Sequence, residues 1–428
     1  MNIEPDFVTG DLARFELDAR GGRGLARGVV RPRTTHDVRE FLRWARSTRT
    51  RVVPQGANSG LVGASTPDDS GTMVVLSTEL LTSLLVVDAS QRSATVSAGV
   101  TLSRLNGAAR SAGLFFPIDL GADPTLGGMV STNTGGSRLV RYGDVRHNLL
   151  GLEVVVADDA VSVIRCGRGL DKDNTGLDLK QVFVGTGGAL GIVTEVTVRL
   201  HPLPRTTSTA LVALTDLAQA VQLFDRIAGP SLAAFEVIAA NAMRHTLALT
   251  NERPPFDGGI PSVTALVELV DDDIADRLLT CIGTFEDFVI ASPERCWAMR
   301  HRVTEALRAA GAVIAFDVSV RRAALGELVA RTRALLPPGC ELCEFGHLGD
   351  GGLHLNVVCP GGPLDPTELH KLRLGVFDLV ESFGGSGSAE HGVGPRNRAY
   401  VDPFLAPELG EVHRLLKARF DPLGLLGR

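Results

Sequence analysis

The sequence predicts an α+β fold with more than one domain, on the basis of three observations. The chain of 428 residues is longer than one ordinary hydrophobic core supports, so two or more domains are expected. Up to about residue 204, short runs rich in Val and Ile alternate with helical patterns and glycine turns. After residue 204, longer helical patterns are interleaved with strands, which indicates a second α+β domain.

The first half of the chain contains short apolar runs that predict strands between residues 51 and 200. These runs are RVVP, TMVVL, SLLVVD, ATVSAG, LEVVVA, VSVIR, QVFVG and IVTEVTVRL. Residues 35–49 and 102–114 carry apolar side chains at helical spacing and predict two helices. The segment HPLPRT at 201–206 contains two prolines, which interrupt regular elements, so we expect the first domain to end near residue 204.

The second half combines helical patterns at 214–228, 292–311 and 322–336 with the strands TALVELV and VIAFDVSV. This arrangement is typical of a ferredoxin-like α+β domain. Residues 407–428 predict a helix followed by a short tail. We therefore expect domains at 1–204 and 205–384 and a C-terminal segment at 385–428.

Composition and charge exclude several function classes. The net charge is −6 and there is no polybasic run, so nucleic acid and anionic membrane surfaces are not expected partners. No apolar stretch reaches the length of a membrane span, and the N-terminus lacks the pattern of a secretory signal. We expect a cytoplasmic protein. Its 6 cysteines show no framework spacing and are expected to be reduced thiols, including the lone CxxC at 340 and 343.

The segment EFGHLGDGGLHLNVV at 344–358 is the most informative part of the chain. Its glycine-rich centre makes a helix improbable and predicts a hairpin in which His347 lies roughly opposite His354. After the turn, alternation places His354 and Asn356 on one face and the leucines on the other. A surface hairpin whose histidines only form hydrogen bonds is the simpler alternative.

A second polar cluster, FGGSGSAEHGVGPRNR, follows about 35 residues later and favours a metal site. Two neutral imidazoles and one carboxylate are a common ligand set for a catalytic divalent metal with one open position. We therefore predict that His347, His354 and Glu390 bind the metal and that His391 is the catalytic base. A structural zinc site is less favoured, because such sites usually have four ligands, often cysteines.

Three glycine-rich loops in the first half predict a cofactor site. They lie at 54–63, 121–136 and 185–196, where small residues let backbone N–H groups turn toward an anion. Each loop alone is compatible with an ordinary turn, but three in one domain favour a long dinucleotide. None reads GxGxxG between a strand and a helix, so the usual dinucleotide-binding fold is not indicated.

These motifs together resemble the flavoprotein family of vanillyl-alcohol oxidase and p-cresol methylhydroxylase, and within it the D-2-hydroxy acid dehydrogenases. The resemblance extends over VVRPRTTHDV, PQGANSGLVG, GALGIVTEVTVRLHP, GHLGDGGLHLNV and SAEHGVG. It implies a two-subdomain FAD-binding domain of the p-cresol methylhydroxylase type, a ferredoxin-like substrate domain, and a C-terminal segment that returns toward the flavin. Asn58 and Ser59 stand where relatives with covalent flavin have a histidine, so the FAD is expected to be noncovalent.

The resemblance also implies the residues that contact FAD. They are Pro54, Gly56, Ala57, Asn58, Ser59, Gly60 and Leu61 in the first loop, Leu120, Gly121, Ala122, Gly127, Gly128, Ser131, Asn133 and Gly136 in the second, and Ile192.

By the same resemblance, the reaction is oxidation of a D-2-hydroxy acid, best D-2-hydroxyglutarate, to the 2-oxo acid by hydride transfer to flavin N5. Zinc or another divalent metal would hold the substrate hydroxyl while His391 takes its proton. The resemblance places Arg300, Thr304 and Asn356 around the substrate. The implied partners are the 2-hydroxy acid and an electron acceptor such as an electron-transfer flavoprotein or a quinone, and a homodimer is a candidate assembly.

Departures from the family pattern bear on the substrate. Ala315 stands where hydroxyglutarate dehydrogenases have a substrate-binding lysine, and Gly352 and Asn397 replace a usual Asn and Lys. The alternatives are therefore a D-lactate or glycolate enzyme, or a non-catalytic FAD-binding subunit of a glycolate oxidase complex. The histidine and glutamate set argues against the subunit, which would not need it.

Overall fold

The computed structural model describes residues 5–8, 10–281 and 283–427, so the outermost ends of the expected domains at 1–204 and 385–428 lie outside it. The chain divides into two compact units. Unit 1 comprises the described residues of Met1–Gly135, Gly143–Leu203 and Glu390–Arg428, and unit 2 comprises Gly136–Tyr142 and Pro204–Ala389. The short piece Gly136–Tyr142 thus clusters with the second half of the chain, and the C-terminal segment clusters with the first half.

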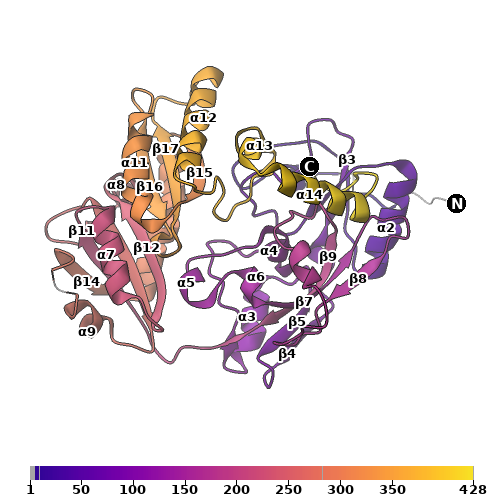
Figure 1. Ribbon diagram of the computed structural model, residues 1–428, viewed down its shortest axis with the longest axis horizontal. Helices are drawn as coiled ribbons and strands as arrows, with labels where there is room; N and C mark the ends of the chain where they lie inside the picture. The colour runs from indigo at the N-terminus through magenta and orange to yellow at the C-terminus, as the bar shows by residue number, and fades with distance from the viewer. Residues whose placement is uncertain (1–4, 9, 282, 428) are drawn as a thin grey trace. The chain divides into compact units, whose positions relative to one another are not determined.

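Unit 1 contains three sheets and a set of short helices (Figure 1). A parallel sheet has the order β1(Ala26–Val30), β3(Met73–Ser77), β2(Val52–Gln55). An antiparallel sheet has the order β4(Leu85–Asp88), β5(Ser93–Ser97), β9(Ile192–Arg199), β7(Leu149–Val155), β8(Val163–Cys166), and β10(His201–Pro202) pairs with β6(Leu114–Phe115). The helices are α1(Ala13–Glu16), α2(Thr35–Thr48), α3(Leu102–Arg110), α4(Leu126–Thr132), α6(Val145–Asn148), α13(Gly394–Val401) and α14(Pro407–Phe420).

The predicted elements of unit 1 form with one exception. Helix α2 begins where a capping box satisfies its first N–H groups, because Thr34 accepts from the Asp37 backbone and Asp37 accepts from Thr34. The run QVFVG at 181–185 was predicted as a strand, and this prediction is wrong. It forms the end of a 3-10 helix, Leu179–Val182, followed by a turn at Gly185, where φ is 76°. Three apolar residues before a glycine do not distinguish a strand from a buried turn.

Unit 2 is built on one sheet of seven strands with helices beside it (Figure 1). The strand order is β14(Asp287–Ala291), β11(Thr207–Leu214), β13(Val263–Val270), β12(Leu232–Ala239), β16(Glu341–Gly346), β17(Gly352–Cys359), β15(Ala312–Ser319), with antiparallel neighbours throughout. The helices are α5(Leu139–Tyr142), α7(Leu217–Ile227), α8(Ala240–Thr250), α9(Ile274–Leu279), α10(Pro293–Ala310), α11(Leu325–Ala334) and α12(Pro366–Ser382).

The predicted hairpin is confirmed as β16 and β17, but its register differs from the prediction, because Phe345 and not His347 pairs with His354, and Cys343 pairs with Asn356. His347 follows the end of β16. Leu353 and Leu355 are buried as expected. The opposite face is also covered, since Asn356 is 7% exposed and Val358 packs in a core cluster with residues of α8 and α10. Strand β17 lies between two neighbours and is buried on both faces, so its histidine and asparagine lie inside the unit.

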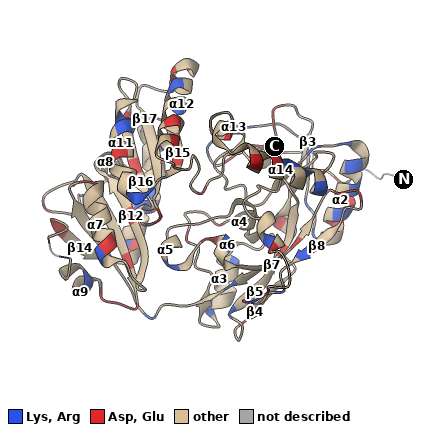
Figure 2. Ribbon diagram, in the orientation of Figure 1, with Lys and Arg blue, Asp and Glu red and all other residues tan. Residues whose placement is uncertain are grey.

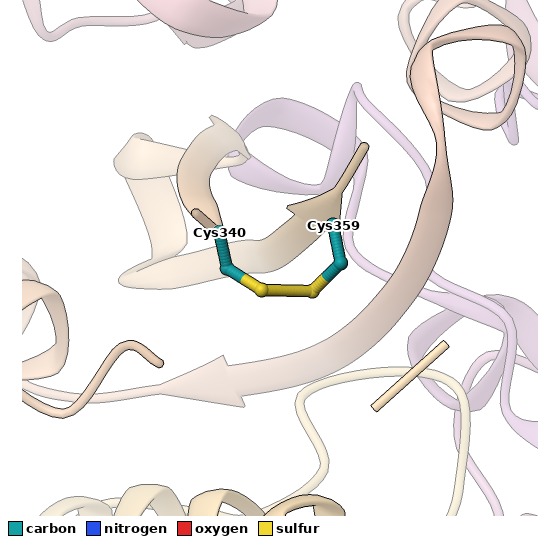
Figure 3. Close-up of a disulfide and its surroundings, with 2 residues drawn as sticks. All are labelled: Cys340 and Cys359. Atoms are coloured by element: carbon teal, nitrogen blue, oxygen red, sulfur yellow. A yellow bond between two sulfur atoms is a disulfide. The ribbon is translucent and has the colours of Figure 1, made fainter. Parts of the chain in front are cut away.

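The expectation that all six cysteines are reduced is wrong for one pair. Cys340 and Cys359 form a disulfide with a Cα–Cα distance of 4.4 Å, which joins the open ends of β16 and β17 (Figure 3). The spacing of 19 residues gave no signal, because the hairpin register alone brings the two residues opposite each other. The remaining cysteines, Cys166, Cys281, Cys296 and Cys343, are free and buried.

Charged residues of both signs are distributed along the elements of each unit, which agrees with the absence of a polybasic run (Figure 2). Among the described residues, we find no helix with the length and apolar character needed to cross a membrane.

Candidate active site

The three glycine-rich loops of unit 1 meet one another. A Cβ on Gly56 of the first loop would lie 2.4 Å from Thr125 Oγ1 and 3.5 Å from the Cα of Gly128, so the first two loops are in close backbone contact. A Cβ on Gly188 of the third loop would lie 2.9 Å from Cγ of Pro54. Only glycine fits at such approaches.

Backbone hydrogen bonds join the second and third loops. The N–H of Gly185 donates to the Val130 carbonyl at 3.1 Å, and that of Gly187 donates to the Ser131 carbonyl at 2.7 Å. Three loops that come from separate parts of the chain therefore form one glycine-lined surface. A glycine-lined surface of this kind suits a long dinucleotide such as FAD, because small residues let a ligand approach the backbone closely.

Two of the predicted FAD contacts have side chains that hold the loops themselves. Asn58 Nδ2 donates to the carbonyls of Arg14 and Leu17, and φ is 55° at this residue. Asn133 Nδ2 donates to Asp144 at 2.8 Å. Ile192 is 1% exposed in the core at the start of β9. That these three residues contact FAD stays a prediction.

The hairpin histidines of unit 2 lie side by side, as predicted. The ring centroids of His347 and His354 are 5.3 Å apart, edge to face, and the His354 ring is 5.1 Å from that of Phe345. Each imidazole also faces a buried carboxylate through Nδ1. His347 Nδ1 is hydrogen-bonded to Glu236 Oε1 at 2.5 Å, and His354 Nδ1 lies 3.5 Å from Asp317 Oδ1.

Glu236 on β12 and Arg300 on α10 form a buried ion pair, in which Arg300 Nε donates to Glu236 Oε2 at 2.6 Å. Burial alone would raise the pKa of the Glu236 carboxyl, but its interactions with His347 and Arg300 outweigh burial and lower it to about 2. The Arg300 guanidinium also lies 4.6 Å from the centroid of the Phe345 ring. Thr304, one turn further along α10, is exposed.

A group able to hold a metal ion forms beside these histidines. One ligand atom each from Asp317, His354, Glu390 and His391 lies within 4.8 Å of all the others. The backbone N–H of Ala389 donates to the Asp317 carbonyl at 3.1 Å, so the chain that enters Glu390 and His391 starts from a residue bonded to β15. The donors are nitrogen and carboxylate oxygen, which suit zinc or a similar divalent ion.

Three of the four residues in this group were predicted from the sequence, His354 and Glu390 as ligands and His391 as the base. The structure adds Asp317, and it places His347 next to His354 but outside the group. Asn356 is buried directly opposite Ala315 on β15, the position at which the family resemblance led us to expect a lysine.

Sequence reasoning missed the buried acids of unit 2. Glu236 accepts from Arg300 and His347, while Glu268 accepts from Arg138 at 2.7 Å and from Trp297 Nε1 at 2.7 Å. A signal was present, because each acid is the lone charge in an apolar strand, LAAFEVIA and VTALVELV. A buried carboxylate needs a donor or cation nearby, so such a residue indicates a paired site.

Two family models match the chain and together span most of its length. One, described as an FAD binding domain, matches residues 26–165, and the other, described as the C-terminal domain of FAD linked oxidases, matches residues 203–428.

Comparison with individual proteins gives relatives over nearly the whole chain. The chain is 36% identical over 428 residues to the mitochondrial D-2-hydroxyglutarate dehydrogenase of Bos taurus, which covers 94% of this chain and 76% of the relative. It is 30% identical over 459 residues to a putative mitochondrial D-lactate dehydrogenase of Schizosaccharomyces pombe, with coverage of 97% and 84%. A solved alkyldihydroxyacetonephosphate synthase superimposes with a TM-score of 0.71 at 18% identity, covering 93% of this chain and 76% of that one, which shows a shared fold.

Proposed function

This chain belongs to the family of FAD-linked oxidases that includes the D-2-hydroxyglutarate dehydrogenases, and on this basis we propose that it oxidises a D-2-hydroxy acid to the 2-oxo acid. One observation carries the proposal beyond family membership. In unit 2, the Arg300 guanidinium contacts Phe345, and Phe345 contacts His354, a member of the metal-competent group. Arg300, a cation that can bind the substrate carboxylate, is thus linked through Phe345 to His354, which belongs to the group that can bind a metal and the substrate hydroxyl.

We assign a separate role in the reaction to each residue of the site. Arg300 binds a carboxylate of the substrate, and Asn356 donates to the same molecule from β17. His391 takes the hydroxyl proton as the C2 hydrogen leaves with its electron pair. FAD, held by the three glycine-rich loops, would supply the acceptor for that hydride when bound. Thr304 is exposed in this structure, so its contact with substrate remains a prediction.

The metal ligands we propose are His354 and Glu390 of the metal-competent group, together with His347, which lies outside that group but contacts His354. Asp317, a member of the group, faces His354, and Glu236 faces His347. Histidines that ligate metals usually donate their other ring nitrogen to a carboxylate, and both Nδ1 atoms face one here. A divalent ion at this place would lower the pKa of the substrate hydroxyl and fix its orientation.

The best candidate substrate is D-2-hydroxyglutarate, by analogy with the bovine relative. A second candidate, D-lactate or glycolate, is favoured by one residue. Ala315 lies opposite Asn356 and offers no charge to a second carboxylate. We propose an electron-transfer flavoprotein or a quinone as electron acceptor and the cytoplasm as location, although both relatives described above carry mitochondrial in their names.

Turnover by the purified protein with a dye acceptor tests the proposal. We expect bleaching of the flavin by a D-2-hydroxy acid and not by its L-enantiomer, and comparison of D-2-hydroxyglutarate, D-lactate and glycolate decides between the candidates. His391→Ala should lower kcat by about 100-fold or more while FAD and metal stay bound. His413→Ala, an exposed histidine of α14, is the control. Full turnover by His391→Ala would contradict the proposed role of the base.

A further inference from the structure

Glu236 is the one charged residue of β12, and both of its oxygens are engaged by side chains of the candidate active site. Oε2 accepts from Arg300 and Oε1 is bonded to His347, while the residue itself is 0% exposed. Burying a carboxylate is unfavourable unless it is fully paired, so this position is occupied by a charge for a reason other than packing.

The partners of Glu236 also contact each other through two aromatic rings. Arg300 lies over Phe345, Phe345 packs against His354, and His354 meets His347 edge to face. Together with Glu236, these side chains form a closed series of five residues that come from β12, α10 and the hairpin. Moving the carboxylate would therefore move the arginine and the imidazole together.

We propose that Glu236 is a positioning residue that orients Arg300 for the substrate carboxylate and His347 for the metal, an inference that rests on the proposed function. Because Nε of Arg300 donates to Glu236, its two terminal amino groups are left to meet a second carboxylate end-on. Because the Nδ1 side of His347 faces Glu236, the neutral imidazole keeps its proton there and presents Nε2 as the ligand atom.

Because both partners of Glu236 donate a hydrogen bond to it, a neutral glutamine would not replace it. Glutamine offers one acceptor oxygen, and its NH2 group would face a donor, either Nε of Arg300 or Nδ1–H of His347. The imidazole can relieve that conflict by changing tautomer, which removes the free Nε2. Aspartate keeps both oxygens and the charge but is shorter by one methylene.

The test compares Glu236→Gln and Glu236→Asp with Glu344→Gln in the full-length protein that carries FAD and metal. Glu344 is a matched control, because it is a buried strand glutamate paired with a single arginine, Arg333, and its neighbours Cys343 and Phe345 point to the other face of the sheet. The readouts are KM for D-2-hydroxyglutarate, kcat, the melting temperature, and the metal retained after dialysis against a chelator.

We expect Glu236→Gln to raise KM and to weaken metal retention, each by about 10- to 100-fold, and Glu236→Asp to have smaller effects in the same direction. Glu344→Gln should leave KM and metal retention within about twofold of the wild-type values. Wild-type KM and metal retention in Glu236→Gln, or equal losses in both glutamine variants, would overturn the proposal. If Glu236→Gln does not fold, wild-type values in Glu236→Asp overturn it. A wild-type protein that oxidises no D-2-hydroxy acid would instead contradict the proposed function.

Discussion

Buried acidic residues in largely apolar strands are the main feature of unit 2 at the scale of single residues. A buried carboxylate without a partner is strongly destabilising, so its presence implies a donor nearby. The structure provides partners for all of those found in the strands around the hairpin, which are Glu236, Glu268, Asp317 and Glu344. Two of them, Glu236 and Asp317, contact residues that the sequence analysis had placed in the site, namely Arg300, His347 and His354.

Asp317 gives the first prediction at this scale. Its Oδ1 lies 3.5 Å from Nδ1 of His354, so it should hold that ring in the orientation that ligation requires. Asp317→Asn should therefore raise the metal dissociation constant by about 10- to 100-fold. His354→Ala should have a larger effect, and Asp225→Asn, whose side chain is 61% exposed, should have none. Metal quantification after dialysis measures this, and unchanged retention in Asp317→Asn would exclude Asp317 from the site.

Glu344 gives a prediction on pH dependence. Burial raises the pKa of its carboxyl, although Arg333 opposes this. The folded state then binds the proton more tightly than the unfolded state, so the contribution of this group to stability is full below about pH 4.5 and is lost as pH rises through the folded pKa. We expect Glu344→Gln not to show this loss of stability as pH rises. The measurement is the urea midpoint from pH 4 to 7 for Glu344→Gln, for wild type and for the exposed-site control Glu408→Gln. Parallel dependence of the midpoint on pH in all three proteins would contradict the prediction.

At the scale of elements, the hairpin and the glycine-rich loops were both predictable because local patterns encode them. Alternation and a glycine turn specify β16 and β17, and small residues specify the loops. What the loops contact is not local. Gly127 in α4 lies against Ala98, and its missing Cβ would be 2.6 Å from the Cβ of Ala98. The close approach of α4 to the end of β5 depends on that glycine.

Gly127→Ala should therefore destabilise unit 1 by about 1–3 kcal/mol and lower the FAD content of the purified protein. Ala98→Gly in the same chain should restore part of the loss, because it removes the methyl group that clashes. Gly107→Ala is the control, since nothing lies within 4 Å of the added Cβ in α3, and it should stabilise by about 0.5–1 kcal/mol. Melting temperature and flavin absorbance per chain are the measurements, and a Gly127→Ala protein with native values would refute the predicted clash.

At the scale of the whole molecule, each unit is assembled from segments far apart in the chain. Unit 1 is completed by its C-terminal segment, where the N–H of Val52 donates to the Leu425 carbonyl at 2.7 Å and the N–H of Gly427 donates to the Val52 carbonyl. Lys417 Nζ donates to the Ala189 carbonyl, to Asp421 and to the Leu426 carbonyl, each at 2.7 Å. The last turn of the chain thus supports both β2 and the third glycine-rich loop.

Lys417→Met should consequently destabilise unit 1 by about 2 kcal/mol and weaken FAD retention, because Asp421 and two carbonyls lose a charged donor. Arg414→Met on the same helix, at an exposed position, should change neither. Thermal unfolding and the rate of flavin loss on dilution test this prediction. Equal behaviour of the two variants would mean that the C-terminal segment does not support the flavin loops.

The sequence by itself determined the fold class, most elements and the glycine-rich loops, and it predicted His347, His354, Glu390 and His391 as site residues, with Arg300 added by the family resemblance. Periodicity, turn residues and short motifs are local properties, so they can be recognised in the sequence without the tertiary structure. Only the tertiary structure decided which strands are neighbours. The order of the strands places Cys340 next to Cys359 and Ala315 opposite Asn356. It also places the carboxylates of Glu236 and Asp317 against Nδ1 of His347 and of His354. These contacts join residues that are distant in the chain, and the order of strands in a sheet is fixed by the burial of whole faces, which no local pattern records.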